Sequence, residues 1–420
     1  MKVFEPKILT CFKDYNKKSL INDIVAGIIV AIIALPLSIA LAIASGVSPE
    51  QGLYTAIIAG FVIALFGGSK VNISGPTAAF ATIVATIVKT KGLEGLFLAT
   101  IMAGIILIIM GVLRLGTLIK YIPKTITIGF TAGIAVTLII GQVKDFLGLT
   151  FTDNPIEASE KLVSIVNSIS TINWFALAVG TLALVGMIVW SKYFKKIPAS
   201  LIAVIVGSLI VMIPAVTVTT IGDAFTITSA LPKFNLPTIN GELILSLLPD
   251  AITIALLAGI ESLLSCVVSD GMIKDTHNPN TELIAQGLGN VCSGFFGGIP
   301  ATGAIARTAA NVKNGGRSPI SGMVHAIVLL IVLVALMPLA SFIPMPVIAA
   351  ILFIVAYNMS EWRSFVKIIK EKDVCDIIVL VLTFLLTVIF DLVVAIAVGL
   401  ALHFAILIIK KAASKNKAAE

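Results

Sequence analysis

The chain has 420 residues, of which 58% are hydrophobic and 12% are charged, and its mean hydropathy is +1.09. These values lie outside the range of soluble domains and predict an integral membrane protein. They leave no room for a soluble catalytic domain, so we expect no enzyme activity. The formal net charge of +7 does not indicate nucleic-acid binding, because no basic domain is present to carry it.

The first 21 residues contain five lysines but neither an apolar core nor a small-residue cleavage site. This pattern predicts a cytoplasmic N-terminal segment rather than a removable signal peptide. Cys11, Cys266, Cys292 and Cys375 lack C-x-x-C spacing, and two of them lie in apolar runs. We therefore expect no disulfide, no metal site and no cofactor.

Apolar runs between charged or Gly/Pro-rich breaks predict fourteen membrane spans in two sets of seven. The first repeat, 22–213, has spans near 22–44, 52–66, 76–88, 94–113, 123–142, 171–191 and 199–213. After a connector at 214–246, the second repeat, 247–411, has spans near 247–269, 281–296, 303–313, 319–338, 345–357, 374–390 and 392–410. A short C-terminal tail occupies 412–420.

An even number of spans puts both termini, which are basic, on the same side of the membrane. Placing them in the cytoplasm leaves few cations outside, namely Lys89, Lys91, Lys144, Lys161 and Lys233. Because Lys and Arg concentrate in cytoplasmic loops, this count predicts cytoplasmic termini and an extracellular connector. We expect a multi-pass protein of the inner (plasma) membrane.

Two hydrophobic runs begin with residues that interrupt a membrane helix. The stretch "NISGPTAAFATIVATIV" at 72–88 is matched by "GGIPATGAIARTAANV" at 297–312. Each comes after a related segment, "QGLYTAIIAGFVIALFGG" at 51–68 and "QGLGNVCSGFFGG" at 286–298. Because each set has seven spans, the second must enter the membrane from the opposite side. The sequence thus predicts an all-α inverted repeat.

Interrupted helices of an inverted repeat start near the bilayer midplane and point their free N–H groups at each other. A helix N-terminus carries about +0.5 charge and several donors, which favours anion binding. Six residues at the two tips form the candidate anion site: Thr77, Ala78, Ala79, Thr302, Gly303 and Ala304. The alternative is that they are small residues at helix crossings.

Two isolated charged residues stand out within predicted spans, Arg307 and Glu261. Arg307, one turn into the second broken helix, would add a full positive charge to the site or form a structural ion pair. Glu261 lies midway along "PDAITIALLAGIESLLSCVVSD" and would carry a proton, bind sodium or pair with Arg307. Ser262 and Ser265 flank it and would bind a cation or hydrogen-bond back to the helix.

The first span contains Pro36, which is expected to kink it. Leu37, Ser38 and Leu41 would then form the apolar wall of the anion pocket, or would pack against lipid and neighbouring helices.

Four segments together closely resemble the SulP family of anion transporters, called solute carrier family 26 in animals. They are "PLSIALAIASGVSPEQGLYTA", "NISGPTAAFAT", "GIESLLSCVVSDGM" and "GGIPATGAIARTAANVKNGGRSPISG". The resemblance covers essentially the whole chain. It implies a seven-plus-seven inverted repeat similar to nucleobase transporters, in which a core domain, spans 1–4 and 8–11, moves against a gate domain. It also implies an anion bound between half-helices 3 and 10, with contacts from spans 1 and 8.

Leu37 and Leu41 stand where many members of the family carry Gln and an aromatic residue. Glu261 stands where some sodium-coupled bicarbonate members have Asp, and the longer acid resembles the proton-coupled bacterial branch that moves dicarboxylates. Most members carry a C-terminal STAS domain, which we do not expect here, and many form homodimers.

We therefore expect a secondary active transporter that moves a small carboxylate or oxyanion together with a proton by alternating access. Fumarate-like dicarboxylates, bicarbonate and sulfate remain open, because backbone donors recognise charge and size more than identity. Sodium-coupled bicarbonate symport and uncoupled exchange or channel activity are the alternatives. A non-transporting membrane scaffold would not explain paired broken helices with buried charges.

Overall fold

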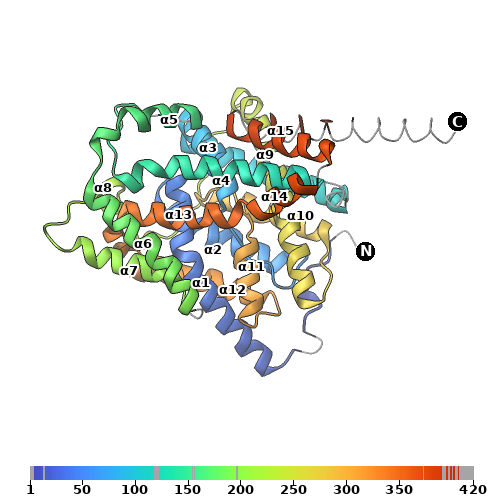
Figure 1. The fold of residues 1–420 in the computed structure, drawn as a ribbon. Coiled ribbons are helices and arrows are strands. Elements are labelled where there is room, and N and C mark those ends of the chain that lie inside the picture. The colour runs from blue at the N-terminus through green and yellow to red at the C-terminus, as the bar shows by residue number, and fades with distance from the viewer. Residues whose placement is uncertain are drawn as a thin grey trace.

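The computed structural model describes residues 4–12, 15–117, 123–153, 155, 157–194, 197–371, 373–389, 394–395, 398–399, 401–402 and 405. This part of the chain is mostly helical (Figure 1). Eight of its helical segments are long and apolar enough to cross a membrane. The protein is therefore a multi-pass membrane protein.

The first half, before the connector, contains seven α-helices and one short strand. They are α1 (Lys17–Ala44), α2 (Pro49–Phe66), β1 (Ser74–Gly75), α3 (Ala81–Val112), α4 (Lys124–Leu147), α5 (Ala158–Asn167), α6 (Trp174–Tyr193) and α7 (Ala199–Val211). α3 contains both the third and the fourth predicted spans. Gly92, with φ of 70°, kinks the helix and changes the direction of the chain between them. The short surface helix α5 has no counterpart among the predicted spans.

The second half follows α8 (Ile221–Ala224). It contains α9 (Gly241–Ile273), α10 (Pro279–Phe295), β2 (Thr302–Gly303), α11 (Ile305–Lys313), α12 (Ile320–Leu336), α13 (Met345–Met359), α14 (Trp362–Glu371) and α15 (Val374–Ile389). The predicted span 392–410 falls largely outside the described residues.

Two helices begin earlier than their hydrophobic runs. α1 begins at Lys17 instead of 22, and α9 at Gly241 instead of 247, so the connector ends sooner than predicted. The reason is N-capping, because the Asn16 and Asn240 side chains accept hydrogen bonds from the backbone N–H groups of Ser19 and Glu242. Such caps extend a helix into the polar region flanking the bilayer, where hydropathy gives no signal.

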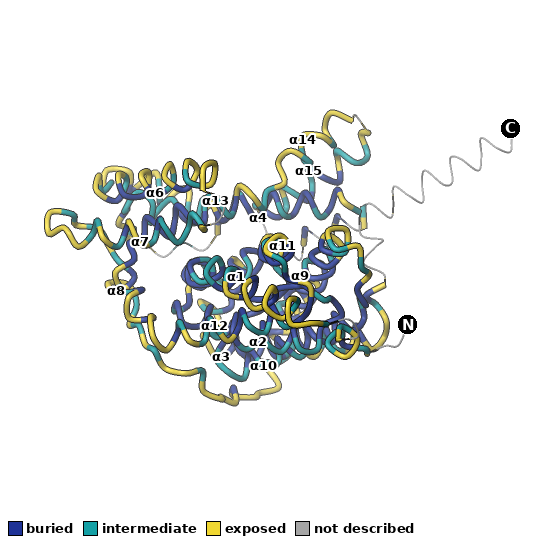
Figure 2. The backbone as a smooth tube through the Cα atoms, turned by 90° about the horizontal axis from the view of Figure 1, so that it is seen from below, coloured by how far each residue is buried: buried dark blue, intermediate teal, exposed yellow. Residues whose placement is uncertain are grey.

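The helices divide into two units, seen side by side in Figure 2. The core unit comprises α1, α2, α3, α9, α10, α11 and α12, which contact one another extensively. The gate unit comprises α4, α6, α7, α13 and α15, with α5 and α14 packed against α4. The division agrees with the assignment of spans to core and gate, as far as the described residues reach.

Close helix packing in the core unit depends on glycine. α3 and α10 meet at Gly104 and Gly287, where a Cβ on Gly104 would lie 2.6 Å from the Gly287 carbonyl oxygen. The reverse contact would be 2.5 Å. Without hydrophobic driving force in lipid, such small residues let helix backbones approach and gain packing energy.

The segment between α7 and α9 is attached to both units. On the gate side, the carbonyl oxygen of Thr219 accepts a hydrogen bond from the Met345 N–H at 2.9 Å. On the core side, the Thr228 N–H donates to Oε1 of the buried Glu50 at 2.6 Å. The connector therefore bridges the two units across one end of the molecule.

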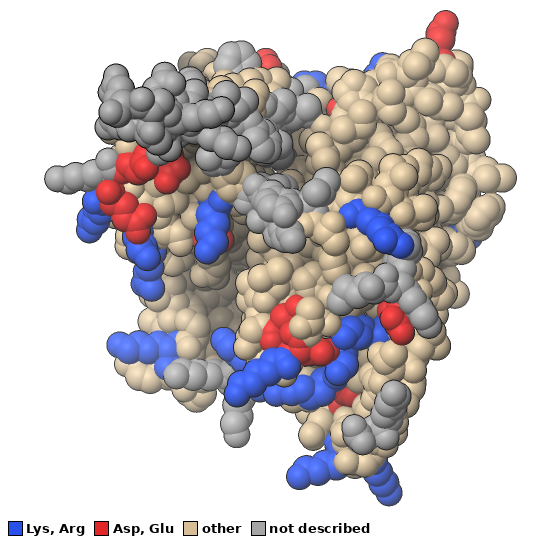
Figure 3. Space-filling view, turned by 90° about the vertical axis from the view of Figure 1, so that its right-hand side faces the viewer, with Lys and Arg blue, Asp and Glu red and all other residues tan. Residues whose placement is uncertain are grey.

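Charged residues gather at the other end. Figure 3 shows the right-hand side of the molecule as drawn in Figure 1. On this face, Lys and Arg side chains surround an acidic patch. In the loop before α10, Asp275 forms salt bridges with Lys7 at 3.3 Å and Lys70 at 3.1 Å. These contacts tie the N-terminal segment to the ends of α2 and α9.

Candidate functional site

The two broken helices meet through their extended lead-ins. β1 and β2 pair antiparallel, with Ser74 opposite Gly303 and Gly75 opposite Thr302. The Ala304 N–H extends the pairing by donating to the Ile73 carbonyl oxygen at 2.8 Å. The prediction of two half-helices with short extended lead-ins is confirmed.

Proline marks the end of the first lead-in. Pro76 follows β1 directly and has no N–H that would need a partner. Thr77 remains extended, with φ of −131° and ψ of 160°, before the 3-10 turn at Ala78–Phe80 leads into α3. The first residues of that turn, Ala78 and Ala79, are each 3% exposed. The tip therefore lies inside the protein rather than at a membrane surface.

Arg307 reaches from α11 to the opposite tip. Its side chain is 3% exposed, and Nη2 donates to the Pro76 carbonyl oxygen at 2.6 Å. Nη1 lies against Gly75 and has no hydrogen-bond partner among the described residues. No salt bridge within 4.0 Å joins Arg307 to a described carboxylate. The guanidinium thus brings a buried positive charge and an available donor to the crossing point. The alternative of an ion pair between Arg307 and Glu261 is not seen among the described residues.

Glu261 lies beside the same tip. Its Oε2 accepts a hydrogen bond from the Thr77 hydroxyl at 3.0 Å. Thr302, which is 0% exposed, instead donates its hydroxyl to the Ala258 carbonyl oxygen at 2.7 Å, one turn earlier in α9. α9 therefore contacts both tips, one through a carboxylate and the other through its backbone.

Ser262 and Ser265 do not join Glu261 in these contacts. The Ser262 hydroxyl donates to Glu282 Oε1 at 2.9 Å, and the Ser265 hydroxyl donates to Asn72 Oδ1 at 2.7 Å. Neither hydroxyl follows the alternative of bonding back to its own helix. Both stabilise the first lead-in instead.

Glu282 is a buried carboxylate that the sequence reasoning missed. It is 0% exposed and accepts hydrogen bonds from the Gly68 N–H, the Asn72 amide and the Gln286 amide at 2.8–3.0 Å. Two signals were available, because Glu282 falls inside the predicted span 281–296 and lies one turn before Gln286 of the repeated QGL motif.

The predicted apolar wall lies next to the tip of α3. Leu41 is 3% exposed and belongs to one hydrophobic cluster with Ala78 and with Leu138 of α4, and Leu37 packs against that cluster. Ser38 is buried, and a Cβ on Gly52 would collide with its carbonyl oxygen, so Ser38 sits where α1 meets α2. Contact of Leu37, Ser38 and Leu41 with a ligand stays a prediction.

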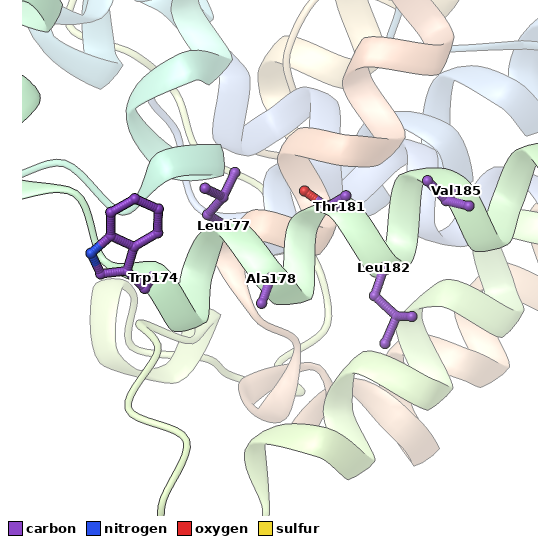
Figure 4. A pocket seen from close by; sticks show the side chains of 6 residues that line it. All are labelled: Trp174, Leu177, Ala178, Thr181, Leu182 and Val185. Carbon is purple, nitrogen blue, oxygen red and sulfur yellow. The ribbon is translucent and has the colours of Figure 1, made fainter.

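A wide pocket of about 500 Å³ on α6 is not part of this site. Figure 4 shows its lining side chains, Trp174, Leu177, Ala178, Thr181, Leu182 and Val185. None of them is charged, and Trp174 is 73% exposed. Such a surface is typical of a helix that faces lipid. No group of three or more His, Cys, Asp and Glu side chains in the described part of the chain is arranged to bind a metal ion.

Comparison with known sequences identifies relatives over most of the chain. The profile of the sulfate permease family matches residues 20–383. YvdB of Bacillus subtilis (strain 168), which bears the name of a sulfate transporter, is 43% identical over 396 residues, covering 94% of this chain and 74% of that protein. The bicarbonate transporter BicA of Picosynechococcus sp. (strain ATCC 27264 / PCC 7002 / PR-6) is 36% identical over 395 residues, covering 90% and 68%.

Solved structures agree with the fold. The transmembrane domain of a cyanobacterium bicarbonate transporter BicA matches with a TM-score of 0.82 at 32% identity, over 91% of this chain and 98% of that domain. Murine Slc26a9, an anion transporter in the inward-facing state, matches with a TM-score of 0.87 over 96% and 71%, and at 18% identity it supports the fold alone. The seven-plus-seven inverted repeat is thereby confirmed. With the family profile extending over both broken helices and the core around them, the chain belongs to the sulfate permease (SulP) family and is an anion transporter rather than an enzyme.

Proposed function

We propose that this protein is a proton-coupled symporter of a small carboxylate or oxyanion, such as a fumarate-like dicarboxylate, bicarbonate or sulfate. The anion binds between the N-termini of α3 and α11. The observation that carries the proposal is the buried Arg307 guanidinium, whose Nη1 has no partner among the described residues at the point where the two lead-ins cross. A buried cation of this kind is costly unless an anion offsets it.

The proposed anion site combines one full charge with two helix N-termini. The 3-10 turn at Ala78–Phe80 and the start of α11 at Ile305 each present backbone N–H groups near the crossing. Leu37 and Leu41 supply an apolar wall. Such a site favours a small compact anion, because its few hydrogen-bond donors are fixed in place and its apolar side chains cannot bind additional polar groups.

Glu261 couples a proton to the anion through electrostatic repulsion. Its carboxylate accepts from Thr77 at the tip that binds the anion, so a bound anion and an ionised Glu261 would be close neighbours. Two like charges about 5 Å apart repel by roughly 3 kcal/mol at an effective dielectric constant of about 20. This energy corresponds to about a hundredfold in affinity. Protonation of Glu261 removes the repulsion, so proton and anion bind together.

Alternating access follows from motion of the core unit against the gate unit. The tips, Arg307 and Glu261 belong to the core, whereas Leu138 of α4 and Ile348 of α13 in the same apolar cluster belong to the gate. A contact surface of this kind has few directional hydrogen bonds, so it permits sliding. A homodimer remains a prediction from the family.

Sodium-coupled bicarbonate symport is the second candidate. It is favoured by the 36% identity to the bicarbonate transporter BicA. In that case a sodium ion, rather than a proton, would neutralise Glu261. Uncoupled exchange remains a third outcome, in which transport ignores both cations and responds to opposing anion or voltage.

Uptake into proteoliposomes distinguishes these functions. Labelled fumarate, bicarbonate and sulfate are offered with an inward proton gradient, an inward sodium gradient or neither. We expect the proton gradient to accelerate uptake of at least one anion and Glu261→Gln to abolish the acceleration. If no anion responds to protons and Glu261→Gln behaves like the wild type, proton coupling is wrong.

Arg307 provides the test of the binding site. Arg307→Ala should lose uptake while keeping the wild-type melting temperature in detergent, and Arg307→Lys should keep part of it, because a lysine retains the charge without the planar donor pair. An Arg307→Ala variant with unchanged anion affinity would contradict the proposed site.

A further inference from the structure

A second pocket, of about 210 Å³, lies where α3, α4 and α5 come together (Figure 1). Unlike that of the α6 pocket, its lining includes charged side chains, three lysines and one aspartate among apolar residues. It is lined by Ala85, Lys89, Ile140, Gly141, Lys144, Phe151, Asp153, Pro155 and Lys161. Lysines are thus brought from three different helices into one small cavity.

Two of these ammonium groups are held in place by packing rather than by salt bridges. The Lys161 Nζ lies 3.7 Å from where a Cβ would stand on Gly141. The Lys144 Nζ lies 5.2 Å from the centre of the Phe151 ring. Among the described residues, neither lysine has a carboxylate oxygen within 4.0 Å.

Acidic side chains also lie near these lysines, including Asp145, which interacts electrostatically with Lys144. The Asp153 carboxylate, in the same pocket, accepts from the Ser164 hydroxyl at 3.0 and 3.1 Å. Burial lowers the pKa of Lys161, and the neighbouring Glu160 opposes that effect. A partly buried ammonium of this kind is stabilised when an anion binds beside it.

The pocket lies on the same helix as the tip of the proposed anion site. Lys89 is eight residues beyond Ala81, where α3 begins, which corresponds to about 12 Å along the helix. α3 belongs to the core unit, whereas α4 and α5 belong to the gate unit. The lysines therefore surround the end of α3 that leads away from its buried tip, at the boundary of the two units.

We propose that this pocket is a second anion site, which captures a small free oxyanion or carboxylate before it reaches the tip of α3. The proposal rests on the anion transport proposed above. A cleft lined by one sign of charge raises the local concentration of the opposite ion and its association rate by about tenfold or more. The same chemistry would hold a lipid phosphate, but the pocket is lined by helices of both the core and the gate unit, unlike the α6 pocket.

Transport kinetics give the first test. In vesicles of phosphatidylcholine alone, the double variant Lys144→Gln/Lys161→Gln should raise the KM for the transported anion about tenfold at low ionic strength, with an unchanged maximal rate. The difference should shrink at 1 M salt, where the screening length is about 3 Å. Lys233→Gln is the matched control, because Lys233 is exposed in the connector and outside the pocket, and it should behave like the wild type.

The kinetic result overturns the proposal if the double variant keeps the wild-type KM or if Lys233→Gln raises it equally. An effect seen with phosphatidylglycerol vesicles but not with phosphatidylcholine vesicles would assign the pocket to lipid headgroups and also overturn it.

Binding is tested separately from transport with selenate, a tetrahedral oxyanion that scatters anomalously. Crystals soaked in selenate should show an anomalous peak in the pocket of the wild type and of Arg307→Ala, but none in the pocket of Lys144→Gln/Lys161→Gln. An empty wild-type pocket contradicts the second site. Arg307→Ala removes the proposed central site. A selenate peak in the pocket of that variant would therefore show that the pocket binds the anion on its own, whether or not the central site exists.

Discussion

Glu282 shows how a charge can be buried in the core unit without a cation. Its two oxygens accept from one backbone N–H and from the side chains of Asn72, Ser262 and Gln286. Asn72 and Gln286 also bond Ser265 and Ser74. The carboxylate therefore fixes the first lead-in by accepting hydrogen bonds from donors on three separate segments.

Replacing Glu282 with Gln should destabilise the protein by roughly 2 kcal/mol, because the amide NH2 would face a buried donor that then lacks an acceptor. The melting temperature in detergent and the anion KM measure the effect, and both should worsen together. Glu242→Gln, at the exposed first turn of α9, is the matched control and should change stability by less than about 0.5 kcal/mol. Equal melting temperatures for the two variants would refute a role for Glu282 in holding the lead-in.

Asp275 predicts a dependence of stability on pH. Burial alone would raise the pKa of its carboxyl group, but the Thr276 N–H, the Lys70 hydrogen bond and the charges of Lys7 and Lys70 outweigh burial and lower the pKa below its ordinary value of 3.8. A lowered folded-state pKa stabilises the protein above the ordinary value, and this contribution is lost as pH falls through the folded-state pKa.

Asp275→Asn should therefore reduce stability at pH 7 by roughly 1 kcal/mol or less, and its deficit should shrink as the pH falls below 3.8. Melting temperatures at pH 7 and pH 3 provide the measurement. Glu371→Gln, which removes the exposed salt bridge with Lys367, should have no measurable effect at either pH. A deficit of Asp275→Asn that persists unchanged at pH 3 would argue against the ionic contribution.

At the scale of elements, the crossing of β1 and β2 depends on the absence of side chains. A Cβ on Gly75 would lie 2.5 Å from the Arg307 Nη1 and 3.6 Å from Ala56. The guanidinium can occupy the crossing point only because Gly75 leaves it space. The strand pairing and the charge are therefore parts of one arrangement.

Gly75→Ala should weaken anion affinity about tenfold, or about 1.4 kcal/mol, because the guanidinium must shift away from the tips. Equilibrium binding or the KM for uptake measures this change. Gly271→Ala is the control, since no atom lies within 4 Å of a Cβ at that position in α9, and a helical alanine should leave affinity unchanged and slightly raise stability. A Gly75→Ala protein with wild-type anion affinity would show that the space left by Gly75 is not needed for anion binding.

Local signals made the broken helices predictable. Pro76 and the repeated Gly-rich segments interrupt hydrophobic runs at places that can be read from neighbouring residues, and Arg307 and Glu261 stand out as charges within spans. The partners of Glu282 could not be read in this way, because Asn72 is 210 residues distant. Likewise α5 and α14 are short surface helices with charged residues, and a search for long apolar runs overlooks them.

At the scale of the whole molecule, the distribution of Lys and Arg predicts orientation. The end that carries the Lys7, Lys70 and Asp275 contacts is rich in cations, and the connector lies at the opposite end. Cytoplasmic loops attract this excess of positive charge. We therefore expect the connector to face the outside of the cell.

Cysteine labelling tests this orientation. In a background without the native cysteines, Lys233→Cys in the connector should react with a membrane-impermeant maleimide in intact cells. Arg363→Cys in α14 should react only after permeabilisation, and both side chains are exposed in the structure. The opposite pattern would mean that the protein is inserted the other way round.

The connector's attachment to both units has a mechanical consequence. Its last gate hydrogen bond is that of the Ile221 N–H, which donates to the Ile343 carbonyl oxygen at 2.8 Å, and its core anchor is Thr228, seven residue steps later. An extended chain covers at most about 3.3–3.6 Å per step. The segment therefore acts as a tether with a maximum reach of about 25 Å. If transport proceeds by displacement of one unit past the other, this tether limits how far the two units can separate at that end of the molecule, and it does so without contacting Arg307 or Glu261.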